Sequence, residues 1–304
     1  MLAYHVPVLL NEVINGLKII PSGIYVDCTF GGGGHSLKIL ELLNAEGRLV
    51  VFDQDEDARK NVPNDNRIIF VPHNFRHLQR FLRLHKIQKV NGILADLGVS
   101  SHQINVAERG FSTRFDAALD MRMDRNGQKT ATDVIRNYSE EQLHKIFEQY
   151  GEVSNSKTLA KAIVEIRKTQ SLKTINEFKN AIYPLVKGNP DKYFAQVFQA
   201  LRIEVNDELN VLKEMLLQTV NVLEEGGRLA VITFHSLEDR IVKNFFKNEN
   251  FEDEQAQARD VFGNPVKKEL KIITKKPIIP SAEELKKNPR SRSSKLRIAE
   301  KVND

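Results

Sequence analysis

The segment DCTFGGGGHS, residues 27–36, joins a short apolar run to a helical pattern. The run IYVDC at 24–28 is typical of a buried strand, and the following residues carry apolar side chains at helical spacing: Leu37, Ile39, Leu40 and Leu43. Glycines at such a junction let the backbone approach a ligand closely, and the helix start offers free N–H groups. A flexible tight turn is the alternative, but four successive glycines cost backbone entropy, so we favour a ligand-binding loop.

Further apolar runs follow in the first hundred residues: RLVVF at 48–52, RIIFV at 67–71 and GILADL at 92–97. A helical pattern at 75–84 separates the last two. Near-continuous apolar runs that alternate with helices are typical of parallel strands buried on both faces. The sequence therefore predicts an α/β sheet with right-handed crossovers.

The middle of the chain has a different pattern. Residues 98–133 show no clear period, and because loops of that length are usually functional or disordered, we favour a function for them. Helical patterns follow at 138–223, with two capping boxes that begin at Ser139 and Thr174, and Gly226-Gly227 is expected to end the last helix.

Strand patterns return at 228–234, 270–274 and 296–299. Strands, then helices, then strands again predict an inserted helical domain at 112–196. Residues 1–111 and 197–304 would together form one discontinuous α/β domain.

Composition limits the class of protein. The 304 residues are 41% hydrophobic, yet they contain no run of about 18 apolar residues and no signal-peptide pattern at the start. A single cysteine, Cys28, fits a reducing cytoplasm, and no closely spaced Cys/His set predicts a metal site. Residues 265–304 carry twelve Lys/Arg against five Asp/Glu, which fits a polyanionic partner; a solvated charged tail is equally consistent.

Three side chains near the strand ends are candidate ligand contacts. Asp53 follows the second strand, where a carboxylate can accept both ribose hydroxyls of a nucleoside; the alternative of a helix cap suits Asp55 better. Asp96 ends the fourth strand and can accept from an adenine amino group or a substrate amine, or else cap the next loop. Phe75 can pack on an adenine ring, although on its own it fits the core equally well.

Two later segments are also candidates. Residues 233–240, TFHSLEDR, follow the fifth strand. We expect Ser236 to cap the next helix with Asp239 at its third position, which leaves His235 unexplained. The second segment places four cations in close order, typical of phosphate contacts, or of a solvated turn before an edge strand: Arg290, Arg292, Lys295 and Arg297.

Nine motifs, in order over nearly the whole chain, resemble the bacterial ribosomal RNA small subunit methyltransferase H family (RsmH/MraW). They are HVPVLLNEV at 5–13, DCTFGGGGHS at 27–36, FDQD at 52–55, DLGVSS at 96–101, ERGFS at 108–112, DMRMD at 120–124, FQALRIEVNDEL at 198–209, FHSLEDRIVK at 234–243 and NPRSRSSKLRIAE at 288–300.

The resemblance implies a class I S-adenosylmethionine (SAM)-dependent methyltransferase fold, Rossmann-like with a mostly parallel sheet and an inserted all-helical domain for substrate recognition. It implies methylation of the exocyclic N4 of a decoding-centre cytosine of 16S rRNA, cytosine 1402 in the family, within the small ribosomal subunit. It also implies a cytoplasmic enzyme whose cofactor is held by Gly33, Gly34, His35, Asp53, Phe75, Asp96 and Gln103.

Three positions depart from the family pattern. Proline is common where this chain has His102 and Ala118, and a more variable or charged residue is common at Gly32. None of these departures removes an implied contact, although His102 directly precedes Gln103.

The residues leave the catalytic base and the oligomeric state open, a dimer included. Asp96, or a neighbouring backbone carbonyl, is the candidate acceptor for an amine whose lone pair is delocalised, and Phe111 or Phe115 is the candidate stacking partner of the cytosine. Rival interpretations are a DNA amino-methyltransferase, a non-catalytic RNA-binding assembly factor, and a dehydrogenase; the last is weakened because the third glycine of GxGxxG would fall on Ser36.

Overall fold

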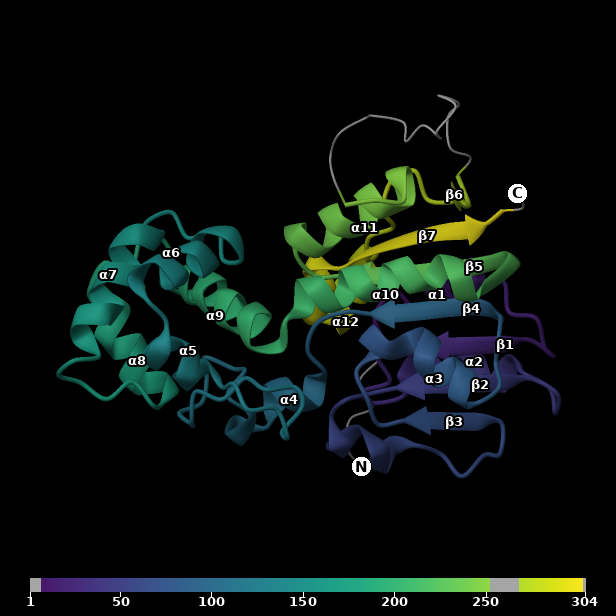
Figure 1. The fold of residues 1–304 in the computed structure, drawn as a ribbon, viewed down its shortest axis with the longest axis horizontal. Helices are drawn as coiled ribbons and strands as arrows, with labels where there is room; N and C mark the ends of the chain where they lie inside the picture. The colour runs from purple at the N-terminus through teal and green to yellow at the C-terminus, as the bar shows by residue number, and fades with distance from the viewer. Residues whose placement is uncertain (1–6, 252–267, 303–304) are drawn as a thin grey trace. The chain divides into compact units, whose positions relative to one another are not determined.

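The computed structural model describes residues 7–251 and 268–302, so the first two residues of the HVPVLLNEV motif and part of the basic segment lie outside the described residues (Figure 1). The chain forms two compact units: Met1–Gly98 with Asn210–Asp304, here called the sheet unit, and Val99–Leu209, here called the helical unit.

The helical unit is larger than the predicted insertion of residues 112–196. At its start, the Arg109 guanidinium donates to the carbonyls of Arg122 and Met123 at 3.0 Å each, which fastens residues before 112 to the helical unit. At its end, one helix runs without a break from Pro190 to Asn206, past the predicted boundary.

The sheet unit contains a seven-stranded sheet in the order β3-β2-β1-β4-β5-β7-β6. All neighbouring pairs from β3 to β5 are parallel, whereas β7 is antiparallel to both β5 and β6. The unit is therefore α/β with a mostly parallel sheet, as the sequence and the resemblance implied. The strands are β1 Ile24–Asp27, β2 Arg48–Phe52, β3 Ile68–Val71, β4 Val90–Asp96, β5 Leu223–Thr233, β6 Leu270–Ile272 and β7 Lys295–Lys301.

Both faces of this sheet are buried, which explains the near-continuous apolar runs. On β2, Val50 faces one hydrophobic cluster, while Leu49 and Val51 face the other. The first cluster includes apolar residues of α3 (Leu78–Leu84), α10 (Glu208–Val222) and α11 (Ser236–Asn248), and the second those of α1 (Leu10–Leu17) and α2 (Gly34–Leu42). The remaining elements of this unit are α12 (Ala282–Lys287) and the 3₁₀ helices η1 (Glu56–Asn61), η2 (Phe75–His77) and η5 (Pro289–Ser293).

The helical unit has its own core, which includes the buried rings of Phe147, Phe178 and Phe198. Both predicted capping boxes are confirmed, at Ser139 with Gln142 and at Thr174 with Glu177. Its helices are α4 (Ser101–Asn105), α5 (Ala131–Asn137), α6 (Glu140–Gln149), α7 (Ser156–Ile166), α8 (Ile175–Ile182) and α9 (Pro190–Asn206), with the 3₁₀ helices η3 (Ala107–Arg109) and η4 (Tyr183–Leu185).

The long helical stretch ends at Val222, one residue before the predicted Leu223, but the two glycines do not end it as predicted. Asp207, with a φ of 52°, separates α9 from α10, and α10 ends at Val222 rather than at the two glycines. Gly226 and Gly227 belong to β5, where Gly226 has a φ of 74° and the register with β4 shifts. The glycines therefore permit an irregular strand start. No helix in the described parts of the chain is long and apolar enough to cross a bilayer.

Candidate functional site

The glycine loop connects β1 to α2 and owes its shape to two of its four glycines. Gly31 and Gly33 have φ values of 51° and 79°, in the left-handed region that side chains disfavour. A Cβ on Gly34 would lie 2.2 Å from Pro7 Cγ, so that position has no room for a side chain. Gly32 is exposed, and a Cβ there would meet nothing within 4 Å, so this position has room for a side chain.

Buried polar contacts tie this loop to the ends of two strands. The Asp27 carboxylate accepts from the Thr29 amide at 2.9 Å and from the Ser36 hydroxyl at 2.7 Å. The Thr29 hydroxyl in turn accepts from the Asp96 amide at 2.7 Å. The Asp27 carboxylate therefore links both ends of the glycine loop, and the Thr29 hydroxyl links the end of β1 to the end of β4.

Asp53 lies where β2 ends, beside the glycine loop. Its two carboxylate oxygens accept from the Gly31 amide at 2.7 Å and from the Asp55 amide at 2.8 Å. Burial raises the pKa of Asp53 to about 6, although the two amides act in the opposite direction. Each oxygen keeps a lone pair for a further donor. Asp55, by contrast, accepts from the Asp57 amide and caps η1, so the capping alternative is confirmed for Asp55.

Asp96 ends β4 at the same edge of the sheet as Asp27 and Asp53. Burial raises its pKa to about 6; the nearby His35 lowers it, and the charges of Asp27 and Glu238 raise it. Its Oδ2 lies 3.7 Å from Nδ1 of His35, whose Nε2 donates to the Val8 carbonyl at 2.9 Å. Among the described residues Asp96 Oδ1 is buried without a hydrogen-bond partner.

The two remaining implied cofactor contacts lie on different units. Phe75 begins η2 in the sheet unit and packs, partly buried, against the first hydrophobic cluster. Gln103 is buried in α4 of the helical unit, where its side chain accepts from the Ser100 amide at 3.0 Å and completes a capping box. His102 occupies the first turn of that helix, a position that also tolerates proline, so the departure from the family pattern leaves Gln103 on a helix.

The expectation that Ser236 caps α11 is wrong, because the cap is His235. The His235 Nδ1 accepts from the Glu238 amide at 3.4 Å, and the Glu238 carboxylate accepts from the Phe234 amide at 2.8 Å. The third residue of α11, which pairs with the capping residue, is therefore Glu238 and not Asp239. The buried His235 Nε2 lies 3.2 Å from Glu238 Oε1 and has no hydrogen-bond partner among the described residues.

The four cations of the basic segment have unequal surroundings. Arg290 and Arg292, on η5, are exposed. Lys295 pairs with Asp239 at 3.2 Å. Arg297 is only 8% exposed, and its guanidinium donates to both Asp239 oxygens, at 2.7 and 3.2 Å. A phosphate contact at Arg297 would require that pair to break.

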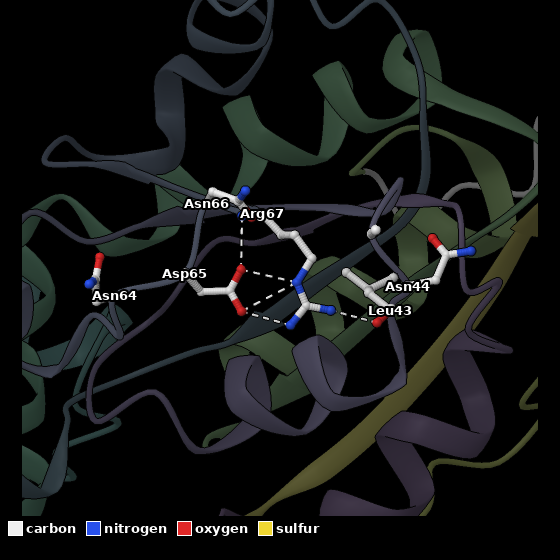
Figure 2. Close-up of a pocket in the computed structure, with 7 residues that line it drawn as sticks. Leu43, Asn44, Asn64, Asp65, Asn66 and Arg67 are labelled. Atoms are coloured by element: carbon white, nitrogen blue, oxygen red, sulfur yellow. Dashed lines mark hydrogen bonds and ion pairs between the residues drawn. The ribbon is translucent and has the colours of Figure 1, made fainter.

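An open hollow lies at the opposite edge of the sheet, where β2 and β3 begin (Figure 2). The Arg67 guanidinium donates to both Asp65 oxygens, at 2.7 to 3.3 Å, and to the Leu43 carbonyl at 2.5 Å. These hydrogen bonds with Arg67 lower the pKa of Asp65 to about 2. The Asp65 carboxylate and the Arg67 guanidinium thus satisfy each other, as expected of a structural contact. The hollow is lined by Leu43, Asn44, Ala45, Asn64, Asp65, Asn66 and Arg67.

The family model and the similar proteins both indicate the same family. The family model described as "MraW methylase family" matches residues 2–302. A protein of Parabacteroides distasonis is 54% identical over 301 residues, covering 98% of both chains, and one of Christiangramia forsetii is 50% identical over 306 residues, covering 99% of both. Both are named ribosomal RNA small subunit methyltransferase H. Among solved structures, a putative rRNA-methylase from Clostridium thermocellum has a TM-score of 0.46 at 11% identity, covering 98% of this chain and 100% of that one.

Proposed function

The chain belongs to the MraW methylase family, and from that premise we propose that it transfers a methyl group from SAM to the N4 of a decoding-centre cytosine of 16S rRNA, cytosine 1402 in the family. The observation that carries this proposal is a similarity over almost the full length to relatives named for small-subunit rRNA methylation. The protein acts in the cytoplasm on the small ribosomal subunit.

The carboxyl edge of the sheet fits the methyl donor. Asp53 has lone pairs left for the two ribose hydroxyls, and Phe75 lies after the neighbouring strand, where it can cover the adenine. No side chain caps α2 within the described chain, so the first-turn amides from Gly34 onward are available to the methionyl carboxylate. Gly33, His35 and Asp96 complete the contacts from the sheet unit, whereas Gln103, in the helical unit, is implied by the resemblance alone.

The methyl transfer needs positioning more than activation, because SAM supplies an already electrophilic methyl group. The N4 lone pair forms the new C–N bond, and the C–S bond breaks with its electron pair left on sulfur. The Asp96 carboxylate, whose side chain is 25% exposed, accepts a hydrogen bond from the N4 amine and then takes its proton. An oriented acceptor of this kind localises the delocalised lone pair of N4 and holds the nitrogen in line with the methyl group.

RNA recognition needs contacts beyond the base. Arg290 and Arg292 are exposed and can reach phosphates, whereas Lys295 would have to leave its pair with Asp239. The cytosine must leave its stack to be methylated. In the helical unit Phe115 is 38% exposed, while Phe111 packs against the helical core, so Phe115 is the better candidate to stack on the base.

Labelled-methyl transfer tests the proposal. The protein should label small subunits purified from a strain that lacks this modification, with the label on one cytosine N4, and should leave already modified subunits and duplex DNA unlabelled. Label on DNA would indicate a DNA amino-methyltransferase, and no transfer to any subunit would indicate a non-catalytic assembly factor. In a calorimetric titration the protein should bind S-adenosylhomocysteine; binding of NAD instead would indicate a dehydrogenase.

A further inference from the structure

Two aromatic rings of the helical unit are exposed to solvent: Tyr183 is 60% exposed and Phe115 is 38% exposed. The other exposed large apolar side chains in the described chain are aliphatic, and all belong to the sheet unit: Ile20, Leu42, Leu84, Leu217, Ile272 and Ile279. Isolated exposed apolar groups are ordinary, whereas exposed groups that gather on one surface mark a binding site. The two rings therefore indicate a binding site if they share a surface.

Lys179 of α8 connects the two rings. Its ammonium group donates to the Thr113 carbonyl at 2.9 Å, two residues before Phe115, and lies 5.2 Å from the centre of the Phe194 ring. The Tyr183 ring stacks on that same Phe194 ring, with the centres 6.4 Å apart and an angle of 27° between the planes. The loop that carries Phe115 and the exposed Tyr183 ring are therefore both neighbours of one lysine side chain.

Both rings are held in place by the helical unit. The loop that carries Phe115 is tied to the start of α8, where the Ile175 amide donates to the Ala117 carbonyl at 2.9 Å. Tyr183 begins η4, and one face of its ring covers the buried Phe194. Because the Tyr183 side chain is still 60% exposed, its opposite face is open to a partner. Rings that are already ordered lose little entropy when they bind.

The charges beside the rings are mainly positive. The Arg114 guanidinium lies 5.5 Å from the centre of the Phe115 ring, and Arg114 and Lys187 are both exposed. Residues 173–192 carry four lysines and only two acidic residues. Exposed aromatic faces flanked by cations are the means by which proteins bind single-stranded nucleic acid, because every base has a face to stack on and every phosphate a negative charge.

We propose that Phe115 and Tyr183 stack on different bases of one single-stranded segment of rRNA, with Arg114 and Lys187 contacting its phosphates. The proposal deepens the proposed function and rests on it, because it names a surface for the strand that contains the target cytosine. A duplex keeps its base faces inside the stack, so this surface selects unpaired RNA.

Substitutions at Tyr183 test the stacking. Tyr183→Phe keeps the ring, whereas Tyr183→Leu still covers Phe194 but has no ring. By fluorescence anisotropy, Tyr183→Leu should bind a fluorescein-labelled single-stranded oligoribonucleotide of the decoding-centre sequence roughly 5- to 100-fold more weakly than the wild type, at an unchanged melting temperature. Tyr183→Phe should bind like the wild type, and so should the control Leu217→Ala, at an exposed residue of the sheet unit. Tyr183→Leu should also raise KM for small subunits and leave kcat nearly unchanged.

An unchanged affinity of Tyr183→Leu for the oligoribonucleotide would overturn the inference. With an unchanged KM for small subunits, it would reduce Tyr183 to a cover for Phe194; with a raised KM, it would show that the surface contacts a protein of the subunit. A wild type that does not bind the oligoribonucleotide would overturn the inference as well. The titration needs no methyl donor, so a wild type that binds RNA through Tyr183 but transfers no methyl group would contradict the proposed function alone.

Discussion

The aspartates at the two edges of the sheet differ in their hydrogen-bond partners and in their pKa values. At the edge where β2 and β3 begin, both oxygens of Asp65 accept from Arg67, and the pKa of Asp65 falls to about 2. At the carboxyl edge, Asp96 keeps a buried oxygen without a partner among the described residues, and burial raises its pKa to about 6. A polar group whose hydrogen bonds are all made within the protein supports the fold. A buried polar group that lacks a partner costs stability, and its retention indicates a ligand.

The largest expected effect of breaking this contrast is on turnover. Asp96→Asn removes the proton acceptor while it preserves size, so kcat for methyl transfer to small subunits should fall roughly 10²- to 10⁴-fold. The matched control is Asp65→Asn, at the other edge, which should methylate at the wild-type rate. A fully active Asp96→Asn protein would remove Asp96 from the mechanism.

The second effect concerns the cofactor. Asp53→Asn loses the charge that accepts the ribose hydroxyls and should weaken the affinity for S-adenosylhomocysteine by roughly 10- to 100-fold in calorimetry. Gly32→Ala, in the same loop, is its control, because a Cβ at this exposed position meets nothing within 4 Å. If both variants bind the ligand like the wild type, the ribose does not lie on Asp53.

The third effect is a pH dependence of turnover. Asp96 accepts the proton only as a carboxylate, and with a pKa of about 6 it is mostly protonated below that pH. The single-turnover rate should therefore fall about tenfold per pH unit below 6 and be level above about 7. The groups that act on Asp96 are His35, Asp27 and Glu238. A rate that stays level down to pH 5 would contradict Asp96 as the base.

The smallest effect is on stability, and its sign follows from the raised pKa. A carboxyl whose folded pKa lies above its ordinary 3.8 loses stabilisation as the pH rises through about 6, so ionised Asp96 costs stability at pH 8. Asp96→Asn should be more stable than the wild type at pH 8, by about 1–2 kcal/mol, and by less at pH 5. Melting curves at both pH values check this; an equal or lower melting temperature at pH 8 would show that ionised Asp96 costs nothing.

Sequence reasoning located what depends on local patterns. The parallel strands and both capping boxes followed from apolar spacing and capping residues, and because parallel strands end at one edge, Asp53 and Asp96 were expected there. It did not predict that His235 caps α11, because histidine is an unusual capping residue and the adjacent Ser236 is a common one.

Other features depend on residues far apart in the chain. Arg297 was interpreted as a phosphate contact, but it pairs with Asp239, 58 positions away, which no local pattern indicates. The Ser100–Gln103 capping box escaped notice because no long helical pattern follows it. Asp96 was recognisable as a strand end, but only packing shows that Oδ1 is buried without a partner in the described chain.

A crystal structure with S-adenosylhomocysteine tests most directly which edge of the sheet binds the cofactor. The ribose hydroxyls should lie within hydrogen-bonding distance of Asp53, about 3 Å, with the sulfur directed toward Asp96. A ligand bound instead in the hollow beside Arg67, or a carboxyl edge that remains empty at saturating ligand, would contradict the account.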